Sequence, residues 1–193
     1  MSRSALPYHH GNLAEALETA ARELLETHSA AELSLREVAR QAGVSHNAPY
    51  HHYGDRASLL KSLAARSMAE LVEAQQLAAD SGGDARDRLL AVGLAYVGYA
   101  VEHAHAFALI YDPEVCVPGD PSSAMSALID ANHALLAGLV AELWPHADEQ
   151  ARAARAAALW STVHGLAQLV TAGHLPREVV APALATLSDT DAR

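Results

Sequence analysis

The chain has 193 residues, of which 51% are hydrophobic and 19% charged. A chain of this length buries about 70% of its extended surface, so it needs neither disulfides nor metal ions to hold a core. Its one cysteine, Cys116, excludes a disulfide within the chain and fits a reducing compartment. Residues 1–11 show no apolar signal-peptide core, and the longest uncharged run, 156–176, is interrupted by several polar side chains. We therefore expect a soluble, cytoplasmic protein with no membrane partner.

The formal net charge of −10 argues at first against nucleic acid, because phosphate binding relies on Lys and Arg. The charge is unevenly distributed, however. Residues 1–66 hold seven bases, seven acids and six of the 12 histidines, whereas residues 67–193 hold six bases and sixteen acids. This asymmetry indicates two parts with different partners.

Apolar residues recur at spacings of three and four along almost the whole chain, which predicts an all-α fold. The first helix is expected to open at Asn12, with Glu15 completing a capping box. A second helix is expected to open at Ser34, with Glu37 completing another capping box, and to run to Ala42.

Gly43 ends this second helix, and Ser45 is expected to cap a short third helix that runs to about His52. A long fourth helix is predicted from about Asp55 to Ala79.

The C-terminal half continues as helices. The segment 85–105 is apolar nearly all round, which is typical of a helix at the centre of a domain. A proline-rich loop follows over 112–121. Two long helices are predicted over 122–144 and 148–173, and a last one begins near Pro176.

Residues 34–53 place a capped helix, a turn and a second capped helix in the spacing of a helix-turn-helix, whose second helix enters the DNA major groove. Gly43 permits the positive φ that a sharp reversal needs, and Val44 supplies an apolar contact. The N-terminus of a helix capped by Ser45 would suit a phosphate. Pro49 is awkward, because a proline inside a helix removes a hydrogen bond.

The residues expected to face the groove carry no negative charge: His46, Asn47, Ala48, Tyr50, His51 and His52. Asn47 is able to read adenine in a bidentate way, and Ala48 to contact a thymine methyl group. Arg36 would reach a guanine edge or a phosphate.

Residues 12–66 resemble the DNA-binding domain of TetR-type transcriptional regulators. The resemblance is carried by the helix start at 34–39, by 43–45, and by 50–56, where Tyr53 and Arg56 stand for the usual Phe and Lys. It implies that Tyr50 and His52 contact phosphates, that Arg56 clamps another, and that residues 45–48 lie against bases.

Residues 160–165 resemble the Trp, His and Gly positions of the WHG-type C-terminal domain of one TetR subgroup. The resemblance implies a helix-turn-helix domain (1–54), a linking helix (55–79), and a C-terminal ligand-binding and dimerisation domain (80–193). The protein is then a ligand-responsive repressor that needs no cofactor and is not an enzyme.

The wide apolar arcs of the helices over 122–144 and 148–173 favour a four-helix interface between two copies, and a dimer suits a palindromic DNA site. The expected interface residues are Leu135, Leu139, Trp160, Val163, Ala167 and Val170. A pocket for a small, largely apolar effector is expected inside the C-terminal domain. Its expected lining residues are Tyr96, Tyr99, His103, Phe107, His133 and Gln168.

Two other functions stay open. A helical protein-interaction module would carry the same helices without binding DNA, and the neutral N-terminal segment is compatible with it. A metal-binding helical-bundle enzyme is disfavoured, because the sequence has one Glu-x-x-His, at Glu102 and His105, and a di-iron bundle needs two.

Overall fold

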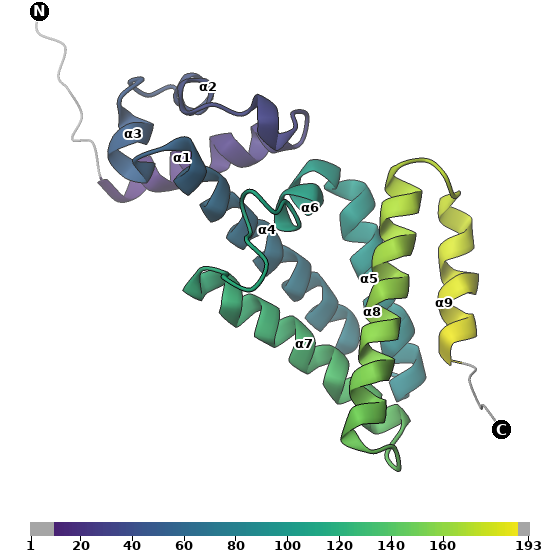
Figure 1. Ribbon diagram of the computed structural model, residues 1–193. Coiled ribbons are helices and arrows are strands. Elements are labelled where there is room, and N and C mark those ends of the chain that lie inside the picture. Colours follow the sequence, from purple (N-terminus) through teal and green to yellow (C-terminus); the bar gives the residue numbers. More distant parts are fainter. Residues whose placement is uncertain (1–9, 189–193) are drawn as a thin grey trace, which may run out of the picture.

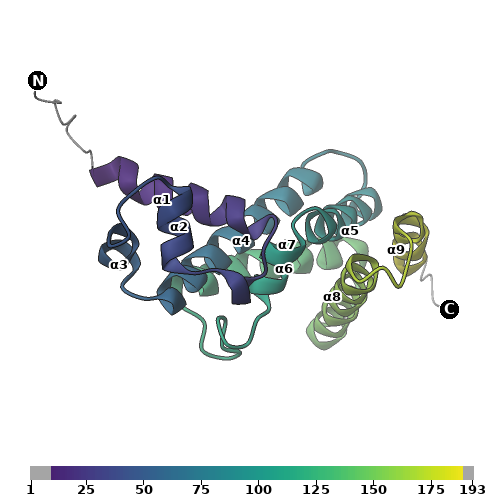
Figure 2. The same cartoon turned by 90° about the horizontal axis from the view of Figure 1, so that it is seen from above.

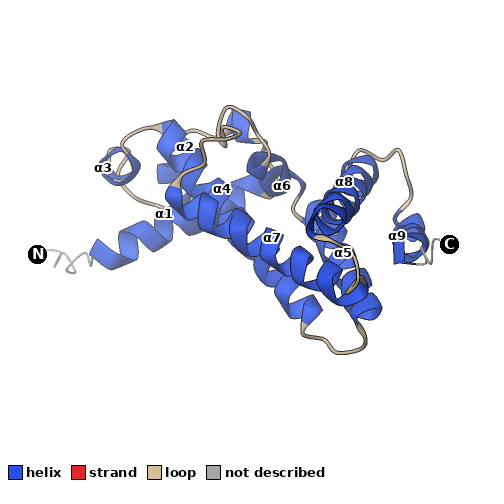
Figure 3. Cartoon of the chain, turned by 60° about the horizontal axis from the view of Figure 1, so that its bottom comes forward, coloured by secondary structure: helices blue, strands red, loops and turns tan. Residues whose placement is uncertain are grey.

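The computed structural model describes residues 10–188, and within that range the chain is built of helices and loops without a strand (Figure 3). The expectation that the first residues contain no signal peptide falls almost entirely outside this range. The predicted all-α fold is confirmed. The elements are α1 (His10–Leu25), the 3-10 helix η1 (Ala30–Glu32), α2 (Leu35–Gln41), α3 (Ala48–Tyr53), α4 (Arg56–Ala79), α5 (Ala85–Glu102), α6 (Ala104–Ile110), α7 (Ser123–Leu143), α8 (Glu149–Thr171), η2 (Arg177–Val179) and α9 (Val180–Ser188).

Side-chain caps fix the starts of five helices, among them the predicted cap at Ser34; at α5 the Asp84 carboxylate accepts a hydrogen bond from the backbone N–H of Asp87 at 3.0 Å. The hydroxyls of Ser34 and Ser122 accept hydrogen bonds from backbone N–H groups three residues on, at 3.2 and 3.3 Å. The carboxylates of Asp55 and Asp148 do the same at 2.8 Å. Each cap satisfies an N–H group that would otherwise lack a partner at the helix terminus.

Three predicted boundaries are wrong. Helix α1 already contains Asn12, so this residue is not its cap. Helix α3 begins at Ala48, with Asn47 rather than Ser45 at the cap position. The helix expected over 85–105 ends at Glu102, and α6 follows in a new direction because His103 has non-helical backbone angles (φ −127°, ψ 51°).

Helix α4 connects the two parts of the molecule (Figure 1). Its buried residues recur at spacings of three and four from Leu59 to Ala79. At its start they pack with α1 and α3, and further along α4 contacts α5, α6 and α7. Buried residues of α4 thus join the N-terminal and C-terminal parts in one continuous hydrophobic core.

Helix α5 occupies the centre of the C-terminal part, where it contacts α4, α6, α7, α8 and α9 (Figures 1 and 2). Its position explains why its sequence has no polar face. Gly93 allows α9 to approach closely, because a Cβ there would lie 2.9 Å from Leu184 Cδ1.

Helix α7 is the one helix among residues 10–188 that is long and apolar enough to cross a membrane by length and composition alone. Only 22% of its apolar window is buried within the protomer. It runs beside α4 and meets α8 at its C-terminal end (Figure 1). Much of its apolar surface is therefore free to contact another molecule.

Candidate nucleic-acid interface and ligand cavity

The turn between α2 and α3 has the geometry that the sequence indicates. Gly43 adopts φ +66°, in the left-handed region that favours glycine. The next residue, Val44, donates its backbone N–H to the carbonyl oxygen of Ala39 at 3.0 Å, which closes the end of α2. Pro49 is buried in the first turn of α3, where its missing N–H costs no hydrogen bond. The later start of α3 therefore removes the difficulty that Pro49 posed.

The residues expected to face DNA form one exposed surface. His46, Asn47, Tyr50, His51 and His52 are exposed, and Ala48 is half-buried at the start of α3. Tyr50 is 46% exposed although it is a large aromatic residue. Nearly half of its surface is therefore available to a partner.

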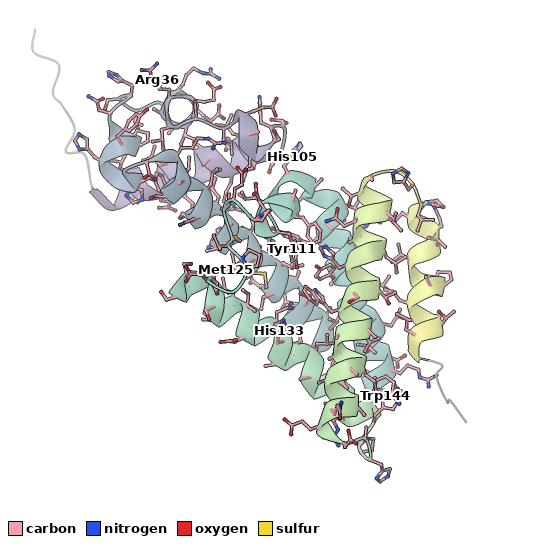
Figure 4. The ribbon with its side chains drawn as sticks, in the orientation of Figure 1. Arg36, His105, Tyr111, Met125, His133 and Trp144 are labelled. Carbon is pink, nitrogen blue, oxygen red and sulfur yellow. The ribbon has the colours of Figure 1, made fainter. Side chains whose placement is uncertain are left out.

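The same surface is basic rather than acidic. Arg36 lies at its outer edge, pointing away from the rest of the molecule (Figure 4). The acidic side chain next to Arg36 in the sequence, Glu37, forms an ion pair with Arg40 at 2.5 Å. This contact keeps the pKa of the Glu37 carboxyl group below its usual value. A phosphate approaching α2 therefore meets Arg36 and a carboxylate that is already paired.

Arg56 has a structural partner that the sequence did not reveal. Its guanidinium donates to the backbone carbonyl oxygen of Leu33 at 2.8 Å and to that of Ala30. These bonds tie the start of α4 to η1 and to the segment before α2. Arg56 is exposed, yet its first effect is to hold the helix-turn-helix in place.

In the C-terminal part, a polar network joins α5, α6 and α8. The Tyr96 hydroxyl lies 2.7 Å from that of Tyr111 and 2.9 Å from Nδ1 of His164. Tyr96 is 1% exposed and stacks edge-on against Phe107, with ring centroids 5.4 Å apart. Burial raises the pKa values of both tyrosines and lowers that of His164, so all three groups stay neutral.

Two adjoining cavities lie beside this network. The inner one, of about 50 Å³, lies between α4, α5, α7, α8 and α9. The outer one, of about 340 Å³, is closed by the loop after α6. Asn132, His133 and Trp160 line both. Figure 4 places Tyr111, Met125 and His133 around this part of the molecule.

Of the six residues expected to line a pocket, Tyr96 and His133 do so. Phe107 is buried in the core beneath the network. Tyr99 and His103 lie toward α1 and α4, where the Tyr99 hydroxyl approaches Glu70 at 3.4 Å, and Gln168 is exposed. These four residues line neither cavity, because residue type alone does not say which side of a buried helix faces a cavity.

The expected dimer residues are also distributed differently. Leu139 (3% exposed) and Ala167 (0%) lie in the protomer's own core, and Val170 packs against that core. Leu135, Trp160 and Val163 line the cavities. The outer faces of α7 and α8 instead carry small exposed residues: Ala134, Ala137, Gly138, Ala154, Ala157 and Ser161.

Four residues of the cavities and the polar network were not predicted from the sequence: Gln75, Tyr111, Asn132 and, as a member of the network, His164. A signal existed for Gln75, because it continues the buried positions Leu71 and Val72 of α4 at a spacing of four and three. A polar residue in an apolar register marks a buried polar group. Among the described residues, no group of three or more His, Cys, Asp or Glu side chains is arranged to hold a metal ion.

Comparison with known protein families gives two matches. The model of "Bacterial regulatory proteins, tetR family" matches residues 18–63, and that of "Tetracyclin repressor-like, C-terminal domain" matches residues 89–189. A search of curated proteins by sequence found no match.

Three solved structures illustrate the similarity. A protein of unknown function from Rhodococcus sp. RHA1 is 34% identical, with a TM-score of 0.81 over 95% of this chain and 97% of that one. A TetR-like transcriptional regulator from the same organism is 20% identical (TM-score 0.69; 95% and 96% covered). FadR of Bacillus subtilis, solved in complex with stearoyl-CoA, is 14% identical (TM-score 0.70; 93% and 100% covered).

Proposed function

Because the chain belongs to the tetR family of bacterial regulatory proteins, we propose that it is a homodimeric repressor that leaves its operator when a small, largely apolar effector binds. The observation that carries the DNA-binding part is the exposed surface of α2 and α3. It combines a turn fixed by Gly43 with an exposed Tyr50 and an exposed, outward-pointing Arg36. The proposal assigns no catalytic role to any residue.

On DNA, α3 enters the major groove. Asn47 and Ala48 at its start contact base edges, while Tyr50 and His52 on its outer turn reach phosphates. The ring of His52 rests edge-on against Tyr53 at 4.5 Å between centroids, which restricts its position. Arg56 acts by holding η1 and α2 in register, and its remaining N–H groups contact a phosphate.

Dimerisation occurs through the outer faces of α7 and α8. Their small residues allow the helices of a second copy to approach closely, as in a four-helix bundle. Two such protomers present two copies of α3 about 34 Å apart, which matches a palindromic operator.

The effector occupies the cavities beside Tyr96 and Tyr111. FadR, whose fold this chain shares, was solved with stearoyl-CoA, a ligand that carries a long apolar acyl chain. The outer cavity is lined by Tyr111 at the end of α6, and α6 contacts η1 of the N-terminal part. The dimer has conformations that differ in the distance between its two N-terminal parts. A ligand that binds more tightly to the conformation unable to bind DNA shifts the population away from the DNA-binding state.

Fluorescence anisotropy tests this function. The purified protein is titrated into labelled DNA from the intergenic regions flanking its gene, and into scrambled DNA, at about 50 and 200 mM salt. We expect selective binding that weakens steeply with salt, and release by an apolar ligand. Equal, weak binding to every DNA would favour the protein-interaction module instead. Ligands that fill the cavity and leave operator affinity unchanged would refute the effector mechanism.

A further inference from the structure

A residue in the wall of the inner cavity carries a polar atom that has no hydrogen-bond partner among the described residues. Gln75 is 6% exposed, and its Oε1 accepts no hydrogen bond from any described residue. Its side chain lines the inner cavity, whose other walls are mostly leucine, valine and aromatic carbon. A buried amide oxygen without a donor costs free energy, so native proteins rarely leave one unpaired.

The walls of the two cavities offer no charged side chain to a ligand. No Asp, Glu, Lys or Arg lines either cavity within the described part of the chain. A carboxylate, phosphate or ammonium group placed there would lose its hydration and gain no opposite charge, which is strongly unfavourable. The polar side chains that line the two cavities form hydrogen bonds without carrying a fixed charge; they include Gln75, Tyr96, Tyr111, Asn132, His133 and Trp160.

The two cavities differ in what they accommodate. The inner one, of about 50 Å³, has room for one small functional group beside Gln75. The outer one, of about 340 Å³, is larger and lined by Met68, Ile110, Met125 and Ile129, among others. They meet at Asn132, His133 and Trp160, so one elongated molecule is able to occupy both.

We propose that the ligand is an uncharged, elongated apolar molecule ending in a hydroxyl or carboxamide group, and that Gln75 is the residue that recognises this end. This inference rests on the proposed effector function and specifies its chemistry. The end group donates to Gln75 Oε1, and the apolar body extends past Trp160 into the outer cavity. Trp160 is one of two tryptophans in the chain, and the other, Trp144, lines neither cavity.

The test uses three probes with the same carbon chain: n-octanol, octanoate and octylammonium. They are titrated into the Trp144→Phe protein while the fluorescence of Trp160 is followed. The titrations are run at about pH 8, above the range in which histidines usually titrate. We expect n-octanol to bind at least about tenfold more tightly than either charged probe. Comparable or tighter binding of octanoate would overturn the inference, as would the absence of saturable binding by all three probes.

Two variants separate Gln75 from general packing. Gln75→Met is expected to weaken n-octanol binding about three- to tenfold, and to leave unchanged or strengthen binding of n-octyl chloride, which donates no hydrogen bond. The control is Gln76→Met, the same change at the next, exposed residue of α4, which should alter neither affinity. Equal loss for both probes, or no loss for n-octanol, would overturn the role of Gln75.

A failure of the inference about the ligand is distinguishable from a failure of the proposed function, because the probe titrations are carried out without DNA. Selective, Gln75-dependent binding of n-octanol with no change in operator affinity would refute the effector mechanism and leave the ligand chemistry standing. Because the three-probe comparison needs no change at Gln75, it stays decisive even if Gln75→Met folds poorly.

Discussion

The hydroxyl of Tyr96 is the centre of the buried polar network, so Tyr96→Phe is a direct test of how much that network stabilises the fold. The substitution keeps the ring that packs edge-on against Phe107 and removes one oxygen atom. That atom serves both Tyr111 and His164, at 2.7 and 2.9 Å. Its loss breaks two hydrogen bonds and leaves two half-buried polar groups without this partner.

Each hydrogen bond contributes about 0.5–1.5 kcal/mol net, and an abandoned buried partner adds its own cost. We therefore expect Tyr96→Phe to lower the free energy of unfolding by about 1–3 kcal/mol. For a chain of this size that corresponds to a fall in Tm of about 3–10 °C.

The assay is urea denaturation followed by circular dichroism, on Tyr96→Phe, Tyr111→Phe and the double variant. The two substitutions remove partners of the same bond, so their effects should fall short of additivity by about 0.5 kcal/mol or more. Tyr50→Phe, at an exposed tyrosine, should change stability by less than about 0.5 kcal/mol. Additive effects at positions 96 and 111, or a loss no larger than that of the control, would refute the reasoning.

Two further predictions concern the dimer and the pH dependence of stability. Gly138 lies on the outer face of α7, where the protomer leaves open space. Gly138→Ala should raise the dimer dissociation constant about tenfold in sedimentation equilibrium, because a close contact between helices of two copies has no room for a methyl group. Gly98→Ala, inside the protomer, should leave it unchanged. Burial lowers the pKa of His164 in the folded protein. As the pH falls below about 6.5, the unfolded chain binds a proton at His164 more readily than the folded chain does, so the free energy of unfolding decreases. His164→Gln should reduce the decrease in the urea midpoint between about pH 7.5 and pH 5.5, whereas the control His146→Gln, at an exposed histidine, should not. Equal pH dependence of the urea midpoint in the two variants would contradict the role given to His164.

Local signals in the sequence were sufficient for most of the fold. The caps at Ser34, Asp55, Ser122 and Asp148 act within three residues, so the sequence contains all that is needed to place them. Gly43 was identifiable for the same reason. The start of α3 was misplaced because Ser45 and Asn47 are both acceptable caps. Burial of Pro49 in the first turn of α3 agrees with the later start.

Features set by tertiary contacts escaped prediction. Nothing in the sequence near His103 resembles a helix stop, yet α5 ends there and α6 turns to pack against α4 and η1. The assignment of helix faces failed for a related reason. Helices as apolar as α7 and α8 do not indicate which arc meets the protomer's own core, so Leu139 of α7 and Ala167 of α8 were assigned to an interface although they are buried within the protomer.

The claim that the exposed surface of α2 and α3 binds DNA is tested most directly by a matched pair of single substitutions. Arg36 and Arg177 are both exposed, and each loses one positive charge on substitution by alanine. Arg177 lies far from α3 and pairs with Glu102 on the surface, a contact of small energetic weight. In anisotropy titrations with the operator, Arg36→Ala should weaken binding about tenfold and reduce the salt slope by about one, while Arg177→Ala leaves both unchanged. Equal affinities and salt slopes for the two variants would contradict the account.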